Sequence, residues 1–256
     1  MQIRTGVIVG LAALLSVFAG AVQASANGTA PPPAPDPIHR VAQIEPGGIS
    51  VPDSQLARDA TRLVRESEGK LLFDHSMRVY YWAAMAGKRK GLAVDPELLY
   101  VASMFHDFGL TQRYQESHLR YEVDGANAAR DFLRSHGVSE ADSQTVWLAI
   151  ALHTTNGVSP HLFPLAALVA EGANMDLVGA GYDDFTSTQR NAVESAYPHP
   201  RGFADEFMQS LYDSLAHRPE TTQGTGLADV MAYKDPRFVR RDFSALMRRS
   251  PWEAGR

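Results

Sequence analysis

From Val51 to about residue 240, apolar residues recur at the three- and four-residue spacing of helices that bury one face. No window shows the sustained alternation of apolar and polar residues that is typical of strands. The pattern predicts helices at about 54–69, 72–90, 95–108, 121–135, 139–154, 164–177, 186–196 and 203–215, with a weaker one after 225. The sequence therefore predicts an all-α domain.

Residues that start and stop helices divide this pattern into segments. Ser54 and Ser139 are predicted to accept hydrogen bonds from the free amides at two helix starts, and Asp95 precedes a proline at a third. Gly91 is predicted to end the second helix, because glycine readily adopts the left-handed conformation found there. His136 is predicted to cap the helix that ends near residue 135.

The N-terminal segment has the pattern of a secretory signal peptide. Arg4 is the only charged residue before an apolar run at 6–22, and Val22-Gln23-Ala24 has small residues at both recognition positions. We predict a signal peptide at 1–24, a proline-rich linker at 25–50, the folded domain at 51–240 and a C-terminal tail at 241–256. An uncleaved anchor is the alternative, but the run is shorter than the about 20 strongly apolar residues that a spanning helix needs. The mature protein is therefore expected to be exported, periplasmic or secreted, without a stable membrane anchor.

The composition and charge of the chain exclude several classes of function. The chain has 24 Lys and Arg residues against 29 Asp and Glu residues, a net charge of −5, and its basic residues are spread rather than clustered. This distribution argues against a nucleic-acid partner and leaves a small-molecule substrate as the expected one. The chain has no cysteine, so disulfides, thiolate zinc sites and cysteine nucleophiles are excluded. The sequence favours no particular oligomeric state.

Polar residues interrupt the apolar faces of four predicted helices. His75, the pair His106-Asp107, His153 and Asp176 each continue an apolar stripe at helical spacing. A single buried histidine usually hydrogen-bonds to a carbonyl group. Imidazoles and carboxylates from four helices satisfy one another best around a cation, so together they predict a metal site.

At these positions the chain resembles the HD-domain metalloenzyme superfamily. The ordered pattern of that superfamily is a histidine, a His-Asp pair and a distant aspartate, which correspond here to His75, His106-Asp107 and Asp176. The segment at 74–82, DHSMRVYYW, is similar to the first-ligand segment of the cyanamide hydratase branch. The segments FHDFGLT at 105–111 and RYEVDGA at 120–126 extend the likeness.

The resemblance implies an HD-domain helical bundle that holds one divalent ion. Its ligands would be His75, His106, Asp107 and Asp176. Nitrogen and oxygen ligands without sulfur suit zinc, iron, manganese, cobalt or nickel. The chain lacks the additional consecutive histidines of two-metal HD phosphodiesterases, which favours one metal, although His153 would be available to a second.

Further residues are assigned roles around this ion. Asp107 is predicted to be catalytic as well as a ligand, and His153 is the candidate proton shuttle, with a purely structural role as the alternative. Arg78 lies one helical turn beyond His75 and could pair with Glu122 beneath the metal. Such a pair would either lock two helices together or contact substrate.

The leading functional hypothesis is an exported metal-dependent enzyme that activates water to attack a small substrate, with cyanamide hydration to urea as the specific reaction. An HD-type phosphohydrolase acting on a phosphoester is the runner-up, but it would call for several cationic anchors, and only Arg78 is well placed by helical phase. A non-catalytic module that binds metal and senses a ligand is the third hypothesis.

Overall fold

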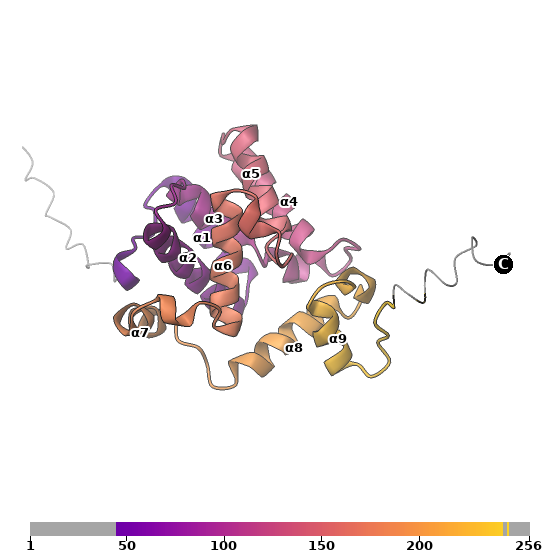
Figure 1. Cartoon of the computed structure of the whole chain (residues 1–256). Helices are drawn as coiled ribbons and strands as arrows, with labels where there is room; N and C mark the ends of the chain where they lie inside the picture. Colours follow the sequence, from indigo (N-terminus) through magenta and orange to yellow (C-terminus); the bar gives the residue numbers. More distant parts are fainter. Residues whose placement is uncertain (1–44, 243–244, 246–256) are drawn as a thin grey trace, which may run out of the picture. The chain divides into compact units, whose positions relative to one another are not determined.

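The computed structural model describes residues 45–242 and residue 245. These residues form α-helices and short 3₁₀ helices and contain no strand, so the predicted all-α class is confirmed (Figure 1). The α-helices are α1 (Gln55–Ser67), α2 (Lys70–Lys90), α3 (Pro96–Phe105), α4 (Tyr121–Ser135), α5 (Glu140–Ala151), α6 (Pro164–Val178), α7 (Ser187–Ala196), α8 (Phe203–Leu215) and α9 (Leu227–Lys234).

The helix ends lie close to the predicted positions because they are encoded locally. Ser54 accepts a hydrogen bond from the amide of Ala57, and Ser139 does the same for Asp142. Gly91 ends α2 in the left-handed conformation, with φ of 64°. The ring of His136 lies 2.9 Å from the carbonyl oxygen of Phe132, so its predicted capping role is confirmed.

Two helices end earlier than predicted, and both ends carry site residues. The third helix was expected to continue to about 108, but α3 ends at Phe105 and a 3₁₀ helix, η2 (Phe108–Leu110), follows. The helix predicted to reach residue 154 ends at Ala151. The turns directly after α3 and α5 therefore contain His106, Asp107 and His153. At these helix ends, side chains from separate helices can meet.

Helix α2 packs most extensively against α6, beside which it appears in Figure 1. The two backbones approach closely at Gly172, where a Cβ atom would lie 2.5 Å from the carbonyl oxygen of Val79. Gly172 precedes Asp176 by one turn, and Val79 follows His75 by one turn. This contact therefore holds the His75 segment of α2 against the Asp176 segment of α6.

A second close approach joins the end of α3 and η2 to the first turns of α4. A Cβ atom at Gly125 would lie 2.6 Å from the carbonyl oxygen of Phe105, and one at Gly109 would lie 2.0 Å from that of Tyr121. The buried guanidinium of Arg218 also donates to the carbonyl oxygen of Gly109 at 2.9 Å and pairs with buried Asp124. The segment after His106-Asp107 is thus fixed from two sides.

Some predictions concern residues outside this description. The signal peptide at 1–24, most of the linker at 25–50 and most of the tail at 241–256 lie beyond the described residues. Among the residues that are described, no helix combines the length and apolar character needed to cross a membrane.

Candidate metal centre

Two imidazoles and one carboxylate meet between α2 and the end of α3. The Nε2 atoms of His75 and His106 are 3.1 Å apart, and they lie 3.5 and 3.4 Å from Oδ2 of Asp107. All three side chains are buried, and one potential ligand atom from each lies within 4.8 Å of the others. This is the arrangement that nitrogen and oxygen ligands of a single divalent ion require.

The hydrogen bonds of the rings direct their lone pairs toward this centre. Nδ1 of His106 lies 2.7 Å from the carbonyl oxygen of Ser103, and Nδ1 of His75 lies 2.6 Å from Oδ2 of Asp176. Because both oxygens can only accept, each Nδ1 carries the proton and each Nε2 carries a lone pair. Metal-binding histidines are oriented in the same way in proteins, so the donor set fits a divalent ion.

His153 contributes a third ring beside the other two. Its Nδ1 donates to the carbonyl oxygen of Ile150 at 2.7 Å, so its Nε2 also carries a lone pair. Nε2 lies 3.7 Å from Oδ1 of Asp107 and 3.2 Å from the hydroxyl oxygen of Tyr121. His153 is outside the group of three within 4.8 Å. It is therefore placed next to the candidate ligand Asp107, as a shuttle or a structural residue would be.

Burial keeps the imidazoles of His106 and His153 neutral. It lowers the pKa of His106 to about 3, with a further contribution from the nearby His75. Burial and the proximity of His106 likewise lower the pKa of His153 to about 4. Neutral imidazole is the form that binds a metal ion or accepts a proton, so both rings are in the required state at neutral pH.

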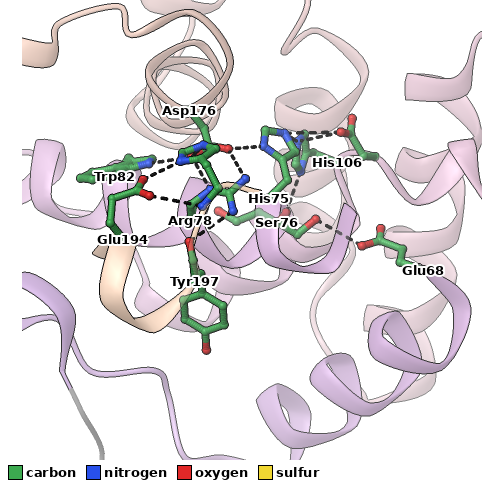
Figure 2. A network of polar contacts seen from close by, with 12 residues as sticks. Glu68, His75, Ser76, Arg78, Trp82, His106, Asp176, Glu194 and Tyr197 are labelled. Atoms are coloured by element: carbon green, nitrogen blue, oxygen red, sulfur yellow. Dashed lines mark hydrogen bonds and ion pairs between the residues drawn. The ribbon is translucent and has the colours of Figure 1, made fainter. Parts of the chain in front are cut away.

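Asp176 lies on the Nδ1 side of His75, away from the Nε2 atoms. Its oxygens accept hydrogen bonds from Arg78 at 2.7 and 2.9 Å and from the indole nitrogen of Trp82 at 3.0 Å (Figure 2). Burial alone would raise the pKa of Asp176, but the nearby His199 ring, 3.4 Å away, and the hydrogen bonds from His75 and Arg78 outweigh it and hold the pKa well below the usual range. In this arrangement Asp176 orients His75, and direct metal binding by Asp176 stays a prediction.

The predicted pairing of Arg78 with Glu122 is wrong. Arg78 is committed to Asp176 because α6 brings that carboxylate to the face of α2 that carries Arg78. Glu122, on the first turn of α4, instead pairs with Arg120 and accepts a hydrogen bond from Thr154. Burial opposes ionisation of Glu122, but these bonds prevail and lower its pKa. Arg78 and Glu122 therefore pair with different residues.

Sequence reasoning missed three polar residues around the centre. Tyr121 was within a quoted motif, but nothing in helical phase showed that its hydroxyl group reaches His153. His199 follows the end of α7 and lies 3.4 Å from Asp176. Glu68 occupies the short turn between α1 and α2, where apolar periodicity carries no information, and it is almost fully buried.

A comparison with protein families agrees with this geometry. The family model of the HD domain matches residues 72–181, a span that includes His75, His106, Asp107, His153 and Asp176. Residues 72–181 are therefore similar to the HD domain, whose members are generally metal-dependent hydrolases that bind divalent ions. No curated protein sequence matches the chain.

Proposed function

We propose that this chain is a metal-dependent enzyme that activates water to attack a small uncharged substrate, and that it hydrates cyanamide to urea. The HD-domain match and the convergence of His75, His106 and Asp107 support metal-dependent water chemistry. The similarity of the His75 segment to cyanamide hydratases supports the specific substrate.

An uncharged substrate is favoured because the two arginines near the metal centre already form ion pairs with carboxylates. Arg78 is fully buried and pairs with Asp176, and Arg120 pairs with Glu122. A phosphoester site needs cations that are available to the transferred group, because charge on its oxygens must be stabilised in the transition state. These two guanidinium groups already neutralise carboxylates, which favours a substrate without phosphate.

His75, His106 and Asp107 would hold the ion, with Asp176 fixing the orientation of His75. When bound, a divalent ion lowers the pKa of coordinated water and polarises an electrophile. The lone pair on Nε2 of His153 would accept a proton from water and return one to the substrate nitrogen. The hydroxyl group of Tyr121 lies within hydrogen-bond distance of the same nitrogen and would donate to this lone pair, so the Tyr121 hydrogen bond would have to give up the lone pair before His153 accepts a proton.

The test is turnover of cyanamide, followed as urea release, with zinc, iron, manganese, cobalt and nickel supplied separately. A phosphomonoester and a phosphodiester are assayed alongside. Urea should form with at least one metal, His106→Ala should abolish it, and His136→Ala should leave it unchanged because His136 is a surface cap. Phosphoester turnover without urea would favour the phosphohydrolase alternative. Metal-dependent stabilisation without any turnover would favour a ligand-sensing module.

The proposed location is outside the cytoplasm. The support is the charged, apolar and small-residue pattern at 1–24 together with the proline-rich segment that follows.

A further inference from the structure

Two apolar clusters meet at the metal centre. The larger one is the core of the helical bundle and includes Phe105 and Ile150, which lie near the ends of α3 and α5. The smaller one contains residues of the C-terminal helices α8 and α9. Both helices lie beyond residues 72–181, the span that is similar to the HD domain. The chain therefore adds an apolar layer of its own to that domain.

The smaller cluster reaches three of the segments that carry site residues. From α2 it includes Leu72, one turn before His75, and from η2 it includes Leu110, three residues after Asp107. From α4 it includes Tyr121, whose hydroxyl group bonds to the third imidazole of the centre. Helices α8 and α9 are therefore packed against the metal centre rather than against a distant part of the bundle.

Phe207 is the residue of α8 that contacts a proposed metal ligand. Its ring lies against the ring of His75, with the ring centroids 4.9 Å apart and the planes at 69°, and only 4% of the residue is exposed. The polar partners of the same imidazole are Asp176 at Nδ1 and His106 at Nε2. Phe207 therefore supplies an apolar wall directly beside a ring that would hold the ion.

Helix α8 is held in this position on both sides of Phe207. Ser214, two turns later, donates to the carbonyl oxygen of Leu110 at 2.7 Å. Phe203, one turn earlier, packs on the guanidinium group of Arg78, which lies 5.1 Å from its ring centroid. Because packed interiors resist displacement, a wall fixed in this way cannot easily move aside for a bulky molecule.

The metal centre is enclosed by its surroundings. No more than 2% of His75, His106 or Asp107 is exposed. In an enclosed site, the surrounding side chains set the space that is left for a substrate, and a change in their volume changes which substrates fit. The volume of the Phe207 ring is therefore expected to limit the size of the substrate.

We propose that Phe207 is a specificity-determining residue whose ring admits to the metal centre only molecules about as small as cyanamide. The inference rests on the proposed function for the presence of the ion, but it does not depend on which substrate reacts there. Replacement of Phe207 by alanine would leave a space beside His75 that a ligand with a phenyl group can fill.

Ligand binding to the cobalt-loaded full chain tests this proposal, because a molecule that joins the ion changes the visible absorption of cobalt. Azide, a linear ligand of three atoms, is the small probe, and 4-phenylimidazole is the large one. Wild type should bind azide and bind 4-phenylimidazole weakly. Phe207→Ala should bind 4-phenylimidazole roughly tenfold more tightly, with the azide affinity and the cobalt content unchanged. Phe207→Leu should give a smaller gain, and it decides the test if Phe207→Ala unfolds.

Phe203→Ala is the matched control. It removes the same phenyl group from the same helix, one turn away, where that group contacts Arg78 and His199 instead of His75. This variant should keep the weak 4-phenylimidazole binding of wild type. Unchanged 4-phenylimidazole affinity in both Phe207 variants would overturn the inference. An equal gain in Phe203→Ala would also overturn it, because loosening of α8 would then explain the result.

Urea release from cyanamide separates this inference from the proposed function. A size limit that depends on Phe207, without urea formation, would refute the cyanamide assignment and leave the role of Phe207 established. Urea formation by wild type, together with unchanged 4-phenylimidazole affinity in both Phe207 variants, would do the reverse.

Discussion

Replacement of Arg78 by alanine should strongly destabilise the fold, because Arg78 is the fully buried partner of an ionised carboxylate. Its Nε and Nη2 atoms donate to the two oxygens of Asp176 at 2.7 and 2.9 Å, and Nη1 donates to the carbonyl oxygen of Tyr197 at 3.3 Å. Removal of one partner from a buried ion pair leaves the other charge uncompensated, at a cost of about 3–5 kcal/mol. For a domain of this size each kcal/mol lowers Tm by about 2–4 °C, so a fall of roughly 6–20 °C is expected.

Denaturant and thermal unfolding of metal-free Arg78→Ala measure this loss. The matched control is Arg58→Ala, which removes an arginine from an ion pair with Asp53 in which both side chains are exposed. Exposed pairs contribute about 0–1 kcal/mol, so this variant should unfold close to wild type. Equal stability of Arg78→Ala and Arg58→Ala would refute the inference that Asp176 is held ionised by a buried partner.

Three further predictions follow from particular residues. Burial raises the pKa of Glu68, so the stability that Glu68 contributes is fully present below its ordinary pKa of 4.5 and is lost as pH rises through the folded value. Glu68→Gln should therefore gain stability relative to wild type in unfolding experiments as the pH rises above 4.5, and a pH-independent difference would contradict the burial argument. His153→Ala should lower turnover by roughly 10²–10⁴-fold with metal retained, and lost metal would make His153 a ligand instead. N-terminal sequencing of exported protein should begin near Ser25, whereas an intact Met1 would favour the anchor.

The helices could be predicted from sequence because their signals are local. Ser54, Gly91 and Ser139 act within one turn of their own position, so the sequence around each is sufficient. The burial of His75 and His106 could also be predicted from the sequence, because helical phase with apolar neighbours shows which face of a helix a residue occupies.

The pairing of side chains from different helices could not be predicted from the sequence in the same way. Helical phase placed Arg78 beside His75, but the choice of Asp176 over Glu122 depends on how α6 packs against α2 at Gly172. Glu68 lies in a turn, where no periodicity exists to reveal that it is buried. Sequence patterns therefore identify which residues face inward, and tertiary packing decides which of them meet.

The central claim is that His75, His106 and Asp107 hold one divalent ion, and elemental analysis of purified protein tests it most directly. The wild-type chain should carry about one ion, and alanine at any of these three positions should lower the occupancy by removing a ligand. His136→Ala, which removes a surface histidine, should retain the full amount. Wild-type metal content in all three ligand variants would contradict the account.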